Sequence, residues 1–134
     1  MKATVIGGCG FLGSRVSAQL YSAGAQVDVA DIASFPLAAP KHIPHHMLSV
    51  MDVSRIREVT RRDHGVLINL AAVHRDDVRP TSLYDDVNVQ GARNVCAAAT
   101  ENGIQKIIFT SSVAVYGFAP LNTDETGEHN FFND

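Results

Sequence analysis

Short apolar runs recur along the chain and alternate with segments of helical period. The runs predict buried strands at residues 3–6, 26–30, 46–48, 66–71 and 106–110. Residues 66–71 are apolar on both faces, as expected for a central strand of a parallel sheet. Strands that alternate with helices indicate a parallel sheet covered on both faces. The pattern therefore predicts an α/β domain.

Helical periods lie between the apolar runs. Helices are expected at residues 11–23, 54–63 and about 82–102, and glycines after the first and third act as stop signals. In the second helix, Ile56 and Val59 are expected to face inward. In the first helix, the apolar positions at helical spacing are Leu12, Val16, Leu20 and Ala23.

Composition and charge narrow the classes of partner. The chain has 134 residues, which suits one domain. Its formal net charge is −3 without a basic run, so nucleic-acid binding has no electrostatic support. No apolar stretch approaches the roughly 20 residues of a membrane helix, and the N-terminus does not have the form of an export signal. Cys9 and Cys96 are isolated, which fits a reducing compartment, so we expect a cytoplasmic protein without nucleic-acid or membrane partners.

Two glycine patterns overlap where the first strand gives way to the first helix. Residues 8–13 fit G-x-G-x-x-G, and Gly7 extends the match to G-x-x-G-x-x-G. Glycines permit a tight turn and let backbone N–H groups approach a pyrophosphate, while the helix N-terminus supplies partial positive charge. The last glycine allows close packing of helix on strand. The turn predicts a dinucleotide site, and a glycine turn without a ligand is the alternative.

Asp31 ends the second predicted strand and follows Gly13 by 18 residues. This is close to the ~20 residues that separate the turn from the acid that binds the adenosine ribose in dinucleotide-binding folds. A carboxylate there accepts from both ribose hydroxyls and repels a 2′-phosphate, so NAD is favoured over NADP. A solvated aspartate at a strand end is the alternative, and Asp28 inside the strand is the competing candidate.

Three further segments add to the glycine turn. Residues 69–72 read N-L-A-A, residues 88–95 read N-V-Q-G-A-R-N-V, and residues 110–117 read T-S-S-V-A-V-Y-G. In this order, and together with residues 7–13, they resemble the extended short-chain dehydrogenase/reductase family, in particular its NAD-dependent nucleotide-sugar epimerases and dehydratases. The resemblance implies a Rossmann-type doubly wound parallel sheet, of which this chain holds about five strands.

The resemblance also implies a set of contacts with NAD. In chain order, the residues are Gly7, Gly10, Phe11, Leu12, Gly13, Asp31, Ile32, Asp52, Val53, Leu70, Ala71, Ala72 and His74. The first five would surround the pyrophosphate, the next two the adenosine ribose, and the following pair the adenine. The last four would line the path to the nicotinamide. Asp52 is equally expected to cap the following helix, and His74 to be a polar loop residue.

Other residues are placed beside the substrate by the same resemblance. Ser112 matches the family's catalytic Ser/Thr, whose hydroxyl would hydrogen-bond the reacting sugar oxygen, and Ser111 is the second choice. Asn88 is expected to be a buried polar residue with a structural role in its helix. Tyr116 belongs to the V-Y-G segment and is not expected to be the catalytic base.

The family's Y-x-x-x-K pair, which supplies the general acid/base, does not occur in residues 1–134. We therefore expect a fragment: an incomplete NAD-binding Rossmann domain, truncated before the sixth strand, without the C-terminal region that binds the nucleotide-sugar substrate. Such a piece is expected to bind NAD weakly, to turn over no substrate and to expose apolar surface that promotes association. The full-length protein is expected to be a homodimer.

Two other functions remain open. One is an NAD(P)-dependent reductase of a non-sugar alcohol or ketone on the same scaffold, and the other is a non-catalytic dinucleotide sensor. Asp31 and the V-Y-G segment favour the sugar enzymes, and Ser112 argues against a sensor.

Two features are set aside as sites. His42, His45 and His46 lack the further ligands of a metal centre, so they are interpreted as a polar loop and no metal is expected. Cys9 lies at a helix N-terminus, which can lower a thiol pKa, but it is interpreted as a small filler residue in the turn.

Overall fold

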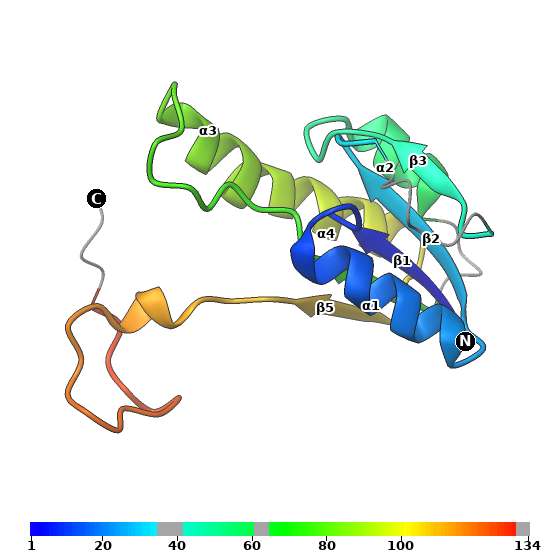
Figure 1. Ribbon diagram of the computed structural model, residues 1–134. Coiled ribbons are helices and arrows are strands. Elements are labelled where there is room, and N and C mark those ends of the chain that lie inside the picture. Colours follow the sequence, from blue (N-terminus) through cyan, green and yellow to red (C-terminus); the bar gives the residue numbers. More distant parts are fainter. Residues whose placement is uncertain (35–41, 61–64, 131–134) are drawn as a thin grey trace.

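The computed structural model describes residues 1–34, 42–60 and 65–130. Within them, five parallel strands form one sheet of order β3-β2-β1-β4-β5 (Figure 1). This is the 3-2-1-4-5 order of a Rossmann-type sheet, which confirms the predicted fold class. Each strand lies within one or two residues of its predicted range. The strands are β1 (Lys2–Ile6), β2 (Gln26–Asp31), β3 (His45–Met47), β4 (Val66–Asn69) and β5 (Lys106–Phe109).

Helices cover both faces of the sheet, as expected for a doubly wound fold. Helix α1 (Phe11–Ser22) lies on one face, and α2 (Val53–Val59) and α4 (Gly91–Glu101) lie on the other (Figure 1). Neighbouring residues of β1 show the alternation, because Val5 packs in the core cluster under α1 and Ile6 in the cluster under α2 and α4.

Helix α1 packs on the sheet partly as predicted: Val16 and Leu20 pack against the core cluster under the helix, whereas Leu12 and Ala23 are exposed. Gly13 and Ser17 are buried, whereas Leu12 is 52% exposed. Gly13 lies directly against the backbone of Gly7 and Gly8, with no side chain between them, and this contact fixes the position of the start of the helix. Leu12, one residue earlier, is rotated away from that contact by about 100°.

The expected helix at residues 82–102 is interrupted in its hydrogen bonding. Residues Ser82–Tyr84 form α3, Asp85–Gln90 form a π-helical segment η1, and Gly91–Glu101 form α4. The Gly91 N–H donates to the carbonyl of Asp86, five residues earlier. Such π-helical turns are rare and are found frequently at functional sites.

Helix α2 begins one residue before its predicted start and ends at Val59. Ile56 and Val59 are buried, which confirms their predicted orientation. The last predicted residues, 61–63, lie outside the described residues. Among residues 1–34, 42–60 and 65–130, no helix is long and apolar enough to cross a membrane.

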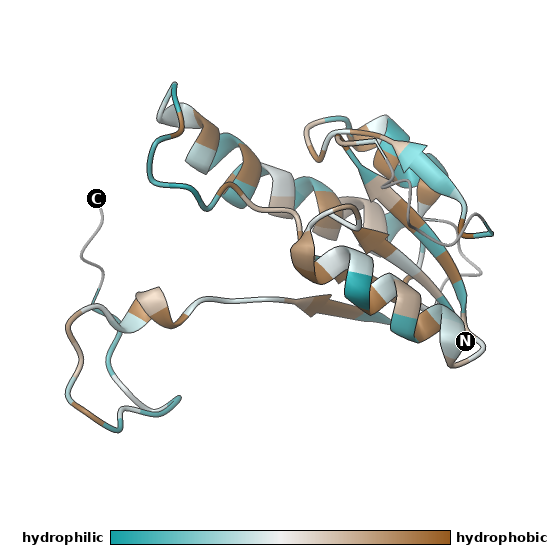
Figure 2. Ribbon diagram, viewed as in Figure 1, coloured by the Kyte–Doolittle hydropathy of each residue, from teal (hydrophilic) through white to brown (hydrophobic). Residues whose placement is uncertain are grey.

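Strand β5 is one of the two edges of the sheet and is apolar after Lys106 (Figure 2). Ile107, Ile108 and Phe109 are 40%, 44% and 59% exposed. The segment that follows runs away from the sheet beyond the carboxyl end of β5 and includes the 3₁₀ helix η2 (Val113–Tyr116; Figure 1). Apolar surface is therefore exposed at this edge, as expected; association through it stays a prediction.

Candidate functional site

The glycine turn lies between the carboxyl ends of β1 and β4, where the order of the strands along the chain reverses. Ligands of open α/β sheets bind at this switch point. Gly7 has φ +76°, and a Cβ there would lie 2.6 Å from the backbone nitrogen of Ala71. A Cβ on Gly13 would lie 2.2 Å from the carbonyl oxygen of Gly7. Glycine is therefore required at both positions by the packing of the chain itself.

Gly10 is different, because no contact within the described part of the chain requires a glycine there. Its φ of −70° and ψ of 178° suit any residue. Among the described atoms, a Cβ at this position would meet only the carbonyl oxygen of Gly7, at 3.4 Å. Gly10 is the N-cap of α1, whose first turn carries no acidic residue. The missing side chain thus leaves space in front of a helix N-terminus, where unsatisfied N–H groups and partial positive charge suit an anion.

Asp31 is hydrogen-bonded to the turn. Its Oδ2 accepts from the backbone N–H of Cys9 at 2.8 Å, and its Oδ1 accepts from the N–H of Ala33 at 2.9 Å. Each carboxylate oxygen has a second lone pair for a further donor. The carboxylate is half-buried, so it is fixed in orientation and still accessible. The structure therefore brings Asp31 and the turn together, as the sequence predicts.

The Cys9 thiol is poorly suited to act as a nucleophile. Burial, together with the neighbouring Asp31 carboxylate, raises the pKa of the Cys9 thiol to about 11. The Cys9 Sγ also lies 3.5 Å from Nε2 of His45. A thiol that stays protonated at neutral pH supports the interpretation of Cys9 as a filler residue.

The residues expected around the adenine lie at the start of α2 and beyond β2. Asp52 caps α2, since its Oδ1 accepts from the N–H of Arg55 at 3.0 Å. Val53 is half-buried in the first turn of the helix, and Ile32 is exposed after β2. The capping role of Asp52 is thus confirmed, and contact with adenine stays a prediction.

The residues expected along the path to the nicotinamide follow β4. The N–H of Leu70 donates to the carbonyl of Ile6 at 2.8 Å, and the N–H of Ala71 donates to Oδ1 of buried Asn69 at 3.3 Å. Ala72 and His74 are exposed. Hydrogen bonds therefore fix the backbone of this loop at Leu70 and Ala71, next to Gly7 of the glycine turn.

Asn88 is exposed, which corrects the prediction of a buried residue. Its amide nevertheless has the expected structural role: Oδ1 accepts from the N–H of Val73 at 2.8 Å, and Nδ2 donates to the carbonyl of Val73 at 2.9 Å. Asn88 therefore fixes the loop after β4 at Val73 although the asparagine itself is exposed.

Two residues of the N-x-x-G-x-x-N pattern have roles that sequence reasoning missed. Asn94 is buried, and its Nδ2 donates to the carbonyl of Val50 at 2.9 Å. A Cβ on Gly91 would lie 2.5 Å from Cγ2 of the same valine. The spacing of three residues, which places all members of the pattern on neighbouring turns, is the signal that could have identified them.

Ser112 is exposed and is the N-cap of η2, where its Oγ accepts from the N–H of Ala114 at 3.1 Å. In Figure 1, η2 lies well away from the glycine turn. Tyr116 packs near His129, with ring centroids 5.9 Å apart. The structure therefore does not bring Ser112 to the predicted cofactor residues.

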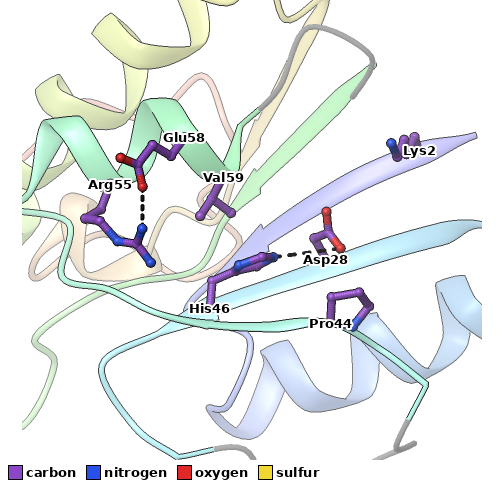
Figure 3. A pocket seen from close by; sticks show the side chains of 7 residues that line it. All are labelled: Lys2, Asp28, Pro44, His46, Arg55, Glu58 and Val59. Carbon is purple, nitrogen blue, oxygen red and sulfur yellow. Dashed lines mark hydrogen bonds and ion pairs between the residues drawn. The ribbon is translucent and has the colours of Figure 1, made fainter.

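A hollow lies between α2 and strands β1, β2 and β3 (Figure 3). His46 Nε2 lies 3.9 Å from Oδ1 of Asp28, and Arg55 forms an ion pair with Glu58. His45 and His46 belong to β3, which confirms the strand expected at His46 and corrects the interpretation of the two as a polar loop. As neighbours on a strand, they point to opposite faces of the sheet. Within the described part of the chain, no group of three His, Cys, Asp or Glu is arranged to hold a metal ion.

The sheet order, the glycine turn and Asp31 at the end of β2 define a dinucleotide-binding domain of the Rossmann type. The family model described as "NAD dependent epimerase/dehydratase family" matches residues 3–133. The chain belongs to the NAD-dependent epimerase/dehydratase family.

Relatives and solved structures agree with this assignment. An Escherichia coli O157:H7 protein named N-acetyl-alpha-D-glucosaminyl-diphospho-ditrans,octacis-undecaprenol 4-epimerase is 42% identical over 134 residues, or 96% of this chain and 38% of that protein. UDP-glucose 4-epimerase of Thermus thermophilus in complex with NAD matches 97% of this chain and 44% of its own, with a TM-score of 0.85 and 27% identity. The Brucella ovis UDP-glucose 4-epimerase with NAD gives a TM-score of 0.88 at 26% identity, over 97% of this chain and 42% of its own. The chain thus spans less than half the length of these proteins.

Proposed function

We propose that residues 1–134 form the NAD-binding part of an epimerase that acts on a sugar carried by a diphosphate. The observation that supports this most directly is the open position at Gly10 beside a fixed carboxylate at Asp31. The space in front of α1 suits a pyrophosphate, and the carboxylate suits a ribose diol. The NAD in the two matched structures supports the same ligand.

We assign each part of NAD to a group of residues in the site. Backbone N–H groups of Phe11 and Leu12 hold the pyrophosphate between Gly7, Gly10 and Gly13. Asp31 and Ile32 hold the adenosine ribose, and Asp52 and Val53 lie beside the adenine. Leu70, Ala71, Ala72 and His74 line the path to the nicotinamide. A 2′-phosphate on the ribose would meet the Asp31 carboxylate, so NAD is preferred to NADP.

The substrate proposed for the whole protein is a nucleotide sugar, because the two matched structures are UDP-glucose 4-epimerases. A sugar on a polyprenyl diphosphate is the second candidate, favoured by the 42% identity to the undecaprenol-linked epimerase. Both substrates present a sugar linked through a diphosphate. Direct assay of the whole protein with each would distinguish them.

The catalytic role of Ser112 also remains a proposal. When bound, NAD supplies reversible hydride transfer at a sugar carbon. The Ser112 hydroxyl would donate a hydrogen bond to the reacting sugar oxygen, once the segment that carries it lies against the site. Residues 1–134 contain no Y-x-x-x-K pair to exchange the proton, so we propose that they bind NAD without turning over a sugar.

Titration calorimetry of the 134-residue chain with NAD and NADP tests the cofactor assignment. Wild type should bind NAD more tightly than NADP. Replacing a hydrogen-bonded charge costs about 1.5–3 kcal/mol, so Asp31→Ala should weaken NAD binding on the order of ten- to a hundredfold and narrow the preference. Asp124→Asn, an exposed carboxylate in the segment after β5, is the matched control and should change neither affinity. Tighter binding of NADP by wild type would refute the role given to Asp31.

A further inference from the structure

One helical element contacts two loops at the carboxyl edge of the sheet. The loop at residues 48–52 joins β3 to α2 and leads into Asp52 and Val53, the proposed adenine contacts. The loop at residues 70–74 follows β4 and contains the proposed path to the nicotinamide. The helical element that contacts both comprises η1 and α4.

Asn94 and Gly91 hold the first loop at a single residue. The buried Asn94 amide donates to the carbonyl of Val50 at 2.9 Å and accepts from Nε2 of Gln90 at 2.9 Å. Gly91 lies so close to Val50 that a Cβ would come within 2.5 Å of its side chain. Val50 is buried, so it cannot yield easily. The backbone two residues before Asp52 is thereby fixed from two directions.

Asn88 holds the second loop by a reciprocal pair. Its oxygen accepts from the N–H of Val73 at 2.8 Å, and its nitrogen donates to the carbonyl of Val73 at 2.9 Å. A side-chain amide supplies both functions at once, whereas a carboxylate lacks the donor and an apolar chain lacks both. The backbone directly after Ala72 is therefore bound to the helix.

Asn88 belongs to the π-helical segment η1, and Asn94 follows in α4. The i→i+5 hydrogen bond of η1, from Gly91 to Asp86, changes the angular offset between Asn88 and Asn94 relative to an uninterrupted α-helix. Six residues of a regular α-helix already turn the two side chains about 120° apart, so the two amides reach different loops with or without the π-helical turn.

We propose that Asn94 and Asn88 are positioning residues that set the two ends of the NAD site from one helical element: Asn94 sets the adenine end through Val50, and Asn88 the nicotinamide end through Val73. The proposal rests on the NAD binding proposed above. Neither residue is assigned a contact with NAD, so each acts through the loop that it holds.

Titration calorimetry with NAD and with ADP, which contains only the adenosine and pyrophosphate part, separates the two ends. Asn94→Leu should weaken ADP and NAD by similar factors, on the order of tenfold for a lost hydrogen bond and a loosened loop. Asn88→Leu should weaken NAD by about five- to tenfold and leave ADP binding unchanged. Gln105→Leu, which removes an exposed side-chain amide beyond the far end of α4 that donates to the carbonyl of Gly103, is the control and should bind both ligands as wild type does.

Amide hydrogen exchange without ligand provides a readout that does not depend on NAD. Asn94→Leu should speed exchange at residues 50–53 and Asn88→Leu at residues 71–74, each without effect on the other loop. Equal weakening of both ligands by both variants, or faster exchange over the whole chain, overturns the proposal because it indicates a loss of fold stability. A wild-type chain that binds neither ligand refutes the proposed function, and the loop-specific exchange then still decides whether the asparagines hold the two loops.

Discussion

Alanine substitutions at Gly10 and Gly13 should affect different quantities: Gly13→Ala should lower stability, and Gly10→Ala should weaken cofactor binding. At Gly13, the new Cβ would lie 2.2 Å from the carbonyl oxygen of Gly7 and 2.5 Å from the Cα of Gly8, whereas ordinary contact begins at 3.4 Å. Both obstacles are backbone atoms, so no rotamer change relieves them. Overpacking of this kind costs about 1–3 kcal/mol or more.

At Gly10, two small effects oppose each other. A Gly→Ala change at a compatible φ,ψ stabilises by about 0.4–1 kcal/mol through the unfolded chain. Alanine is a poorer N-cap than glycine by a similar amount, so the net change in the free energy of unfolding should stay within about 1 kcal/mol. The methyl group would, however, occupy the space proposed for the pyrophosphate. NAD binding should fall by at least about tenfold, which corresponds to about 1.4 kcal/mol.

Thermal unfolding by circular dichroism and titration calorimetry with NAD measure the two quantities on the same samples. One kcal/mol corresponds to a shift of roughly 3–5 °C in the Tm for a chain of this size. Gly13→Ala should lower the Tm by at least that much, and Gly10→Ala should leave it nearly unchanged while NAD binding falls. Gly65→Ala, where a Cβ would meet no described atom within 4 Å, is the control for both assays. If Gly10→Ala binds NAD as tightly as wild type, the open position is not a pyrophosphate site and the reasoning fails.

Three other outcomes are expected. Iodoacetamide should label the exposed Cys96 before Cys9 at pH ~8, as measured by mass spectrometry. The labelling rate at Cys9 should keep rising up to about pH 11, because the pKa of this thiol is raised to that value. Faster labelling of Cys9 than of Cys96 would contradict the geometry around Asp31. Ile108→Lys should suppress concentration-dependent association in sedimentation velocity, because a lysine on an exposed edge strand disfavours pairing; a wild-type chain that is monomeric at high concentration would remove the basis for this expectation. Gly91→Ala should lower the free energy of unfolding by about 1–3 kcal/mol, since its Cβ would overlap the buried Val50; unchanged denaturant unfolding would show that the helix can shift instead.

Most of the fold could be predicted from the sequence because its signals are local. The runs at residues 3–6 and 66–71 report burial directly, and the glycine spacing reports a turn in which packing excludes side chains. Asp31 was found by its distance along the chain from that turn. These features depend on a few neighbouring residues, so one sequence suffices to recognise them.

The remainder depends on contacts that no local pattern encodes. The π-helical turn that ends at Gly91 has no local signal in the sequence, so the pattern of residues 82–102 predicts one regular helix. Leu12 fits an apolar stripe but is exposed, because the depth of α1 is set by the contact between Gly13 and Gly7. The place of Ser112 relative to the turn depends on how the segment after β5 packs, and residues 110–117 contain nothing local that fixes this.

Two main-chain N–H groups of the turn anchor it to the end of β2. Gly7 donates its N–H to the carbonyl of Ala30, and Cys9 donates its N–H to Asp31. The side chains of Phe11 and Leu12 are exposed in the first turn of α1. The sequence contains no tryptophan, so a single Leu12→Trp substitution would place one indole fluorophore beside the proposed pyrophosphate site, at a side chain that is 52% exposed. Because the turn is held by its backbone, this position is available for an optical reporter of binding.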